Sequence, residues 1–145
     1  MARISCTGTL KQSALAEADG QQWVFRREGL MGRRMVIYPG QTAPESMYAL
    51  AVIQPGWNGT GTLAFQDGRT YIWTRSGNWR PVWSWIGAGN KTLLSIKKGR
   101  MLEIAPAASD LPDLALLSLF GLYLILMMES DEVFSAAAIA GAVSV

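Results

Sequence analysis

Three clusters of basic residues offer the clearest binding chemistry in this sequence. They are Arg26-Arg27, Arg33-Arg34 and Lys97-Lys98-Gly-Arg100, and each lies close to residues typical of turns. Basic residues gathered at the turns of a β-rich domain are candidates for contact with anionic lipid headgroups or phosphate. A basic surface that is merely solvated is the alternative interpretation, and the sequence leaves it open.

The tryptophans are a second set of candidate binding residues, because their rings can stack on bases or lie at a membrane interface. The chain contains Trp23, Trp57, Trp73, Trp79, Trp83 and Trp85. Alternation at positions 71/73 and 83/85 places those rings on one strand face, which favours core packing over stacking on nucleobases. We therefore expect no nucleic-acid partner. Trp57 and Trp79 lie in turn-like segments and are candidates for contact with a membrane interface or a protein partner.

The residues that most enzymes need are missing or scattered. The chain has no His, and its single cysteine, Cys6, excludes cysteine-based zinc sites. No nucleophile elbow, Walker loop or dinucleotide fingerprint occurs. The carboxylates of the strand-rich part, Glu28, Glu45, Asp67 and Glu103, mostly sit beside turns, where solvation explains them. We expect a protein that is not an enzyme and that holds neither a cofactor nor a metal ion.

Composition predicts one folded domain, 1–145, with a packed core, because half of the residues are hydrophobic and 17% are charged. The abundance of aromatic residues and glycine favours strands joined by tight turns. All thirteen Lys and Arg lie between Arg3 and Arg100, whereas six of the eleven acids lie from Glu103 onward. This asymmetry suits an anionic partner for the first hundred residues, or mutual neutralisation inside the fold.

The lone Cys6 cannot form an internal disulfide, which suits a reducing compartment. The first eleven residues contain no apolar run of signal-peptide length, so we expect no export signal there. The expected location is the cytoplasm, with membrane association left open.

Short aromatic and β-branched runs alternate with turn residues through most of the chain, as in an antiparallel meander. The expected strands are 22–27, 34–38, 47–53, 62–65, 70–74, 82–86, 92–96 and 101–104. Asp67-Gly68 predicts a type I′ hairpin, because that turn needs positive φ at both central residues.

A helix is expected from Leu114 to Met128, a segment without any charge. Asp110 provides a capping acceptor, Pro112 suits a first turn, and Asp113 suits the positive end of a helix. The acidic segment Glu129–Glu132 is expected to end the helix.

A helix without a polar face must be buried on every side, in protein or in lipid. Fifteen residues rise roughly 22 Å, whereas a bilayer span takes about 20 apolar residues, so we favour burial inside a sheet. Leu119, Leu122 and Ile125 are then all enclosed, and position around the helix does not matter. A closed sheet of this size needs about ten strands. Residues 3–10 offer one more strand, and Val133–Val145 offer either another strand or an interaction tail.

The order of several motifs resembles the Tubby C-terminal-like superfamily, which includes phospholipid scramblases and LURP-one-related proteins. The motifs are Phe65-Gln-Asp-Gly-Arg-Thr-Tyr-Ile-Trp73, Trp83-Ser-Trp85, the strand Met101–Ile104, an acidic spacer and the apolar helix. The resemblance covers Thr62 to Glu132 and implies a β-barrel threaded by a hydrophobic helix. The fold class we expect is therefore α+β, mainly β, with an antiparallel barrel wrapped around one central hydrophobic helix, Leu114 to Met128.

The sequence departs from this superfamily at its ligand sites. The basic residues with which Tubby holds phosphoinositides have no positions that can be matched here. Asp110 and Asp113 lie where scramblases carry an acidic calcium segment, but two carboxylates are too few for a calcium site, so capping is favoured.

The expected function is a non-catalytic binding or scaffolding module, with anionic phospholipid at the cytoplasmic membrane surface or a protein as its partner. The alternative is an integral or peripheral structural subunit of a larger membrane complex, in which Leu111 to Met128 lies in or against the bilayer.

Overall fold

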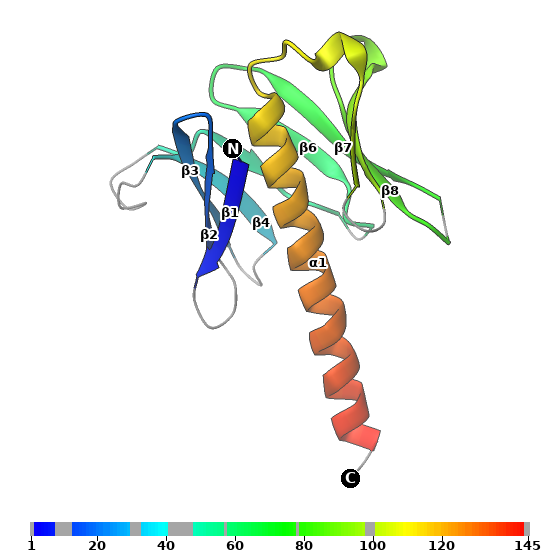
Figure 1. Ribbon diagram of the computed structural model, residues 1–145. Coiled ribbons are helices and arrows are strands. Elements are labelled where there is room, and N and C mark those ends of the chain that lie inside the picture. Colours follow the sequence, from blue (N-terminus) through cyan, green and yellow to red (C-terminus); the bar gives the residue numbers. More distant parts are fainter. Residues whose placement is uncertain are drawn as a thin grey trace.

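Within the part of the chain that the structure describes, ten antiparallel strands pair in the order in which they occur (Figure 1). The computed structural model describes residues 2–7, 13–29, 33–40, 48–56, 58–77, 79–97 and 101–143, with the side chains of the last helix described as far as Glu129. The strands are β1 Ala2–Thr7, β2 Ser13–Ala18, β3 Gln21–Glu28, β4 Arg34–Pro39, β5 Ala51–Ile53, β6 Gly61–Phe65, β7 Thr70–Ser76, β8 Val82–Ile86, β9 Thr92–Lys97 and β10 Met101–Ile104. A single long helix, α1 Leu114–Val143, follows them.

The sheet curls around the first half of α1, which confirms the expected fold class (Figure 1). Within the described residues no pairing joins β1 to β10, so the sheet stays open along one side. Leu102 and Ile104 pair with the buried residues Ile96 and Leu94, and therefore share the inner face of the sheet. They remain 43% and 41% exposed, because β10 is an edge strand.

A strand lies in each of the eight segments expected from the aromatic and β-branched runs, and β1 corresponds to the additional strand offered by residues 3–10. The expected strand 47–53 is shorter than predicted, because only Ala51–Ile53 pairs and Met47 lies outside the described residues. The strand β2 was missed because alanine has a poor strand propensity. Its Ala14, Ala16 and Ala18 are nonetheless at most 2% exposed and alternate along the strand. Such small side chains let α1 approach β2 closely.

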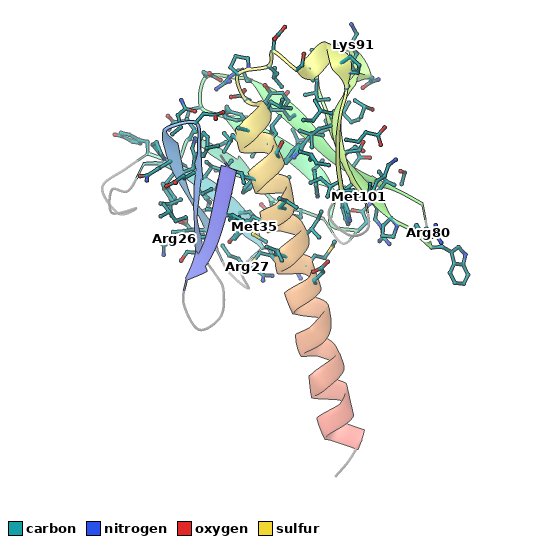
Figure 2. All side chains as sticks on the ribbon, viewed as in Figure 1. Arg26, Arg27, Met35, Arg80, Lys91 and Met101 are labelled. Atoms are coloured by element: carbon teal, nitrogen blue, oxygen red, sulfur yellow. The ribbon has the colours of Figure 1, made fainter. Side chains whose placement is uncertain are left out.

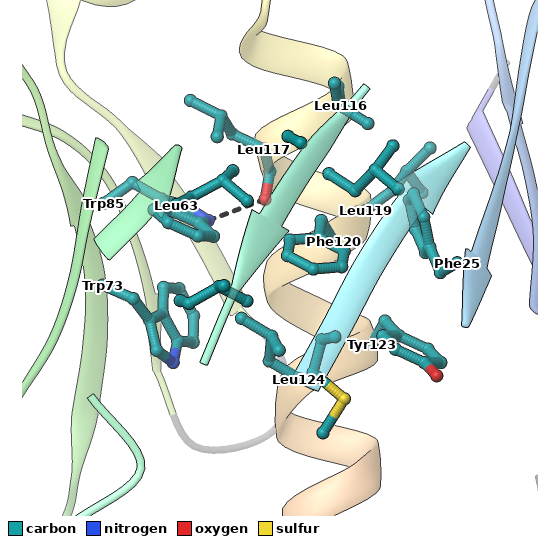
Figure 3. Close-up of a cluster of buried hydrophobic side chains, with 14 of the residues drawn as sticks. Phe25, Leu63, Trp73, Trp85, Leu116, Leu117, Leu119, Phe120, Tyr123 and Leu124 are labelled. Carbon is teal, nitrogen blue, oxygen red and sulfur yellow. Dashed lines mark hydrogen bonds between the residues drawn. The ribbon is translucent and has the colours of Figure 1, made fainter. Parts of the chain in front are cut away.

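The core is formed by one face of the sheet and most sides of the helix. Figure 3 shows Phe120 of α1 between Phe25 of β3 and the two tryptophans Trp73 and Trp85. Phe25 and Phe120 meet edge to face, with ring centroids 5.0 Å apart. Much of Leu111 to Met128, the segment that the alternative interpretation puts in or against a bilayer, thus packs within the chain's own sheet.

Gly121 is the point at which the sheet comes closest to the helix. A Cβ atom at this position would lie 2.9 Å from Ile96 Cδ1, 3.0 Å from Trp85 Nε1 and 3.1 Å from a ring carbon of Trp73. Real Cβ atoms essentially never lie within 3.0 Å of another heavy atom, and distances of 3.0–3.1 Å are tighter than most real Cβ contacts. The missing side chain therefore allows β7, β8 and β9 to pack directly on the helix backbone.

The helix is longer than expected, since it continues past Met128 to Val143. The prediction that Glu129–Glu132 ends it was wrong, as was the strand option for Val133–Val145. Glutamate and alanine are both good helix formers, so this acidic and alanine-rich sequence continues a helix that has already formed.

The expected enclosure of the helix on every side is met only in part. Leu119 and Ile125 are buried, but Leu122 is half-buried and belongs to a stripe that is less covered than the rest. The stripe consists of Ala115, Ser118, Leu122 and Leu126. These residues are three or four apart and so share one helix face, and they are less covered because the sheet is open.

Two local details differ from expectation. Only Gly68 has positive φ in the β6–β7 turn, so Asp67-Gly68 does not form a type I′ hairpin. The Asp67 carboxylate instead accepts a hydrogen bond from the Arg69 amide N–H at 3.0 Å.

At the helix start, the Asp113 carbonyl accepts the first helical hydrogen bond, from the Leu117 amide at 2.8 Å. Asp113, not Asp110, is therefore the residue at the cap position.

Candidate anion-binding rim

A meander brings every second turn to the same end of its sheet, and this alternation assembles the candidate site. The strand ends that meet at one end of this sheet include Glu28 with Arg34, Ser76 with Val82, and Lys97 with Met101. We call the basic residues at this end the basic rim. They are Arg26, Arg27, Arg33, Arg34, Arg75, Arg80 and Lys97.

The same end is where α1 leaves the sheet. Gly59, in the β5–β6 connection, has φ +81°, and a Cβ there would lie 3.0 Å from both Met128 Sδ and a ring carbon of Trp83. The helix is thus still packed at Met128, whereas Glu129 is exposed. Beyond this level α1 extends past the strands (Figure 1). The basic rim therefore lies at the end through which the helix leaves.

The structure places five of the seven predicted anion-binding residues at the same end of the sheet. Arg26 and Arg27 lie at the end of β3, Arg33 and Arg34 at the start of β4, and Lys97 at the end of β9. Figure 2 shows Arg26 and Arg27 at the lower left of the sheet and Arg80 at its lower right, whereas Lys91 lies at the opposite end. The predicted residues Lys98, Arg100 and Trp57 lie outside the described residues.

Trp79 is 96% exposed, as expected for an interface aromatic, and it sits in the β7–β8 turn at the level of the basic rim. The other described tryptophans support the core interpretation. Trp23, Trp73, Trp83 and Trp85 are all buried, and Trp73 stacks on Trp83 with ring centroids 5.3 Å apart.

Arg75 and Arg80 were not recognised as candidates from the sequence, because neither belongs to a basic pair. The strand order provides the missing signal. The Ser76-Gly-Asn78 turn comes four hairpin turns after the Arg33-Arg34 turn, and an even number of turns returns the chain to the same end of the sheet. Arg75 shares the inner face of β7 with Tyr71 and Trp73, and its guanidinium carbon lies 5.6 Å from the Trp83 ring centroid. Such an approach is typical of a cation–π contact.

Some of the rim's positive charge is balanced locally by Glu28. Its carboxylate accepts a 2.5 Å hydrogen bond from the Tyr38 hydroxyl and lies 3.4 Å from Arg34 Nη2 and 4.0 Å from Arg26 Nε. Burial, together with the hydrogen bond to this anion, raises the pKa of Tyr38. The Arg26 and Arg34 side chains are 37% and 50% exposed, so solvent screens both ion pairs and each contributes little to stability.

Lys97 forms the second balanced pair, with its Nζ 2.6 Å from Glu103 Oε2. The hydrogen bond and charge of Lys97 lower the pKa of Glu103. Both side chains are at least half-exposed, so the pair opens at little cost when another anion approaches. Arg33, Arg75 and Arg80 are also exposed to solvent.

The opposite end of the sheet carries an acidic cluster that has a structural role. Asp113 Oδ2 accepts hydrogen bonds from Arg69 Nη1 and from the Tyr71 hydroxyl, the latter at 2.7 Å. Burial and the hydrogen bond to this carboxylate raise the pKa of Tyr71 to about 12. Arg69 also binds Asp67 Oδ2 at 2.8 Å, so the cluster ties the helix start to the β6–β7 hairpin.

These contacts give Asp113 a structural role at the helix start. Among the residues that the structure describes, no three His, Cys, Asp or Glu side chains gather closely enough to hold a metal ion. In the same part of the chain, no helix is both long and apolar enough to cross a membrane.

Comparison with known proteins adds no relative: no protein family, no curated protein and no solved structure matches this chain. The resemblance to the Tubby C-terminal-like superfamily stays a prediction based on its motifs and on the sheet wrapped around a hydrophobic helix.

Proposed function

We propose that the protein is a non-catalytic binding module that attaches to a cytoplasmic membrane surface through its basic rim, with anionic phospholipid headgroups as the ligand. One observation carries the proposal: the ends of the sheet differ in charge among the described side chains. Seven basic residues lie at the rim end with three acids, Glu28, Glu103 and Glu129. Two basic residues, Arg69 and Lys91, lie at the other end with five acids, Glu17, Asp19, Asp67, Asp110 and Asp113. A domain polarised in this way turns one end toward a negative surface.

The chemistry of the rim suits a surface better than a single small ligand. Its basic side chains come from β3, β4, β7, β9 and the β7–β8 turn, and so they are spread along the edge of the sheet. Each Lys or Arg near an anionic membrane contributes about 1 kcal/mol to binding. Several such residues acting together suffice for attachment without a specific pocket.

Trp79 adds a second element suited to a membrane interface. Tryptophan combines an apolar ring with a polar N–H and is enriched at the headgroup level of bilayers. Its exposure of 96%, at the same end as Arg75 and Arg80, leaves nearly the whole ring available for contact with lipid.

Flotation with lipid vesicles tests the proposal. We expect the protein to float with vesicles of phosphatidylcholine and phosphatidylserine, and to bind vesicles of phosphatidylcholine alone much more weakly. Binding that does not depend on anionic lipid, or no binding to either vesicle, would contradict the proposal and would leave a protein partner as the remaining interpretation. Thermal melting of the same preparation shows that the protein tested is folded.

A further inference from the structure

The helix α1 extends well beyond the sheet that surrounds its first half. The segment from Ser130 to Val143 continues for fourteen residues after Glu129, which corresponds to about 21 Å of helix. Figure 1 shows this part running away from the strands, at the end that carries the basic rim. The strands that surround the first half of α1 do not run alongside this part of the helix (Figure 1).

The sequence of this projecting segment divides into two parts. Asp131 and Glu132 follow directly after the exposed Glu129, whereas Val133 to Val143 contain no charged residue. A helix without a charged face needs apolar surroundings on all sides. A protein partner that covers one face leaves the others in water, whereas the hydrocarbon of a membrane surrounds the whole segment.

The length of the uncharged part fits one leaflet. Eleven helical residues rise about 16 Å, and half of a hydrocarbon core of about 30 Å is about 15 Å. A helix satisfies its own backbone hydrogen bonds and so can enter lipid without exposing them. The acidic residues between Glu129 and Glu132 span about 5 Å, which is comparable to the polar headgroup layer on one side of a bilayer.

The charges at this end of the sheet agree with that placement. Arg27 shares the inner face of β3 with Trp23 and Phe25, and Arg75 lies on the inner face of β7. Positive charge therefore lies on the side along which α1 leaves, near the segment that carries the acids. With the rim in the headgroup layer, the helix beyond Glu132 points into the hydrocarbon.

We infer that residues Val133–Val143 of α1 insert into the leaflet to which the basic rim binds, and that they anchor the module with its helix directed into the membrane. This inference rests on the proposed function. A basic patch and a short apolar segment are each weak membrane signals, and attachment becomes stable when two such signals act together.

A dye that reports how deeply a labelled residue lies in the bilayer tests the insertion in the 145-residue chain. The variant Cys6→Ser/Ala138→Cys carries an environment-sensitive fluorophore in the middle of the uncharged segment. The matched control, Cys6→Ser/Ala107→Cys, carries the same dye on an exposed residue at the opposite end of the sheet. With anionic vesicles we expect a blue shift and quenching by spin labels deep in the acyl chains for position 138, and neither effect for position 107.

The two proposals can fail separately in this experiment. A protein that floats with anionic vesicles while the dye at position 138 stays in water overturns the insertion and leaves the surface attachment intact. A protein that does not float with anionic vesicles overturns both.

A second variant tests the insertion without a label. Ile139→Glu places a charge in the uncharged segment, where a charged side chain at membrane depth weakens insertion roughly 100-fold. We expect this variant to keep its preference for anionic lipid but to be released by high salt, whereas Ile139→Leu and the parent protein stay bound. Equal salt resistance of Ile139→Glu and the parent protein overturns the inference. Thermal melting checks that each variant is folded.

Discussion

Trp85 donates a hydrogen bond from its indole Nε1 to the carbonyl oxygen of Leu117, at 2.8 Å and fully inside the core (Figure 3). The same carbonyl is a regular acceptor in the α-helix, so the indole uses the second lone pair of a backbone oxygen. The missing side chain of Gly121 makes room for this approach. A strand side chain and the helix backbone are thus joined directly at the centre of the sheet.

Replacement of Trp85 by Phe should lower the free energy of unfolding by about 1–3 kcal/mol, because the hydrogen bond is lost and part of the ring volume is left empty. Thermal and denaturant unfolding measure the loss. Trp79→Phe is the matched control, since this ring is 96% exposed and its replacement should leave stability unchanged. An equal loss in both variants would show that the Trp85 contact has no special role.

Gly121→Ala sets two effects against each other. Alanine favours a helix by about 1 kcal/mol relative to glycine. Here its Cβ would clash with Ile96 Cδ1 at 2.9 Å and crowd Trp85 and Trp73 at 3.0 and 3.1 Å. Overpacking of a core costs about 1–3 kcal/mol, so we expect net destabilisation. Ser118→Ala, on the half-buried stripe, should be neutral or slightly stabilising. A Gly121→Ala variant that melts above the parent protein would contradict the close packing described here.

A Lys scan of α1 should reveal the open side of the sheet. Lysine at the fully buried Phe120 or Leu117 should abolish soluble expression, because an unpaired buried charge costs several kcal/mol. Lysine at the half-buried Leu122 or Leu126 should reduce the melting temperature but still give folded protein, since a long side chain can extend to solvent. Uniform intolerance around the helix would show that the sheet closes fully in solution.

Alkaline pH should weaken the link between the helix start and the β6–β7 hairpin. The pKa of Tyr71 is raised from 10.0 to about 12 in the folded protein, so the folded state holds the phenolic proton more tightly than the unfolded state. The protonated Tyr71 hydroxyl therefore stabilises the folded state fully below pH 10, and this stabilisation is lost as the pH rises toward about 12. The raised pKa of Tyr38 acts in the same direction. Stability measured against pH should therefore fall less steeply in Tyr71→Phe than in the parent protein, and identical slopes would contradict the assignment.

The strands and the first half of the helix could be predicted because their patterns are local. Aromatic and β-branched runs separated by turn residues define eight strands, and an uncharged apolar run defines the helix core. The strand β2 was not predicted, because its alternating alanines are typical of a helix. The end of the helix was predicted too early, because the acidic residues Glu129–Glu132 are typical of a helix end but also favour helix. In both cases the three-dimensional context decides between two local preferences.

The basic rim could be predicted only in part, for a different reason. Paired arginines are visible in the sequence, whereas isolated ones such as Arg75 and Arg80 become candidates only once the strand order shows which turns share an end of the sheet. The role of Asp113 depends likewise on contacts with Arg69 and Tyr71, which lie more than forty positions away in the sequence.

The affinity of a rim variant for anionic vesicles tests the central claim most directly. The triple variant Arg34→Gln/Arg80→Gln/Lys97→Gln removes three exposed charges from β4, the β7–β8 turn and β9. At about 1 kcal/mol for each charge, its affinity for vesicles containing phosphatidylserine should fall on the order of 100-fold. Two controls should bind like the parent protein: Arg34→Lys/Arg80→Lys/Lys97→Arg, which keeps the charge, and Lys91→Gln, which removes one charge at the opposite end. Unchanged affinity of the triple Gln variant, or an equal loss in Lys91→Gln, would contradict binding through the basic rim.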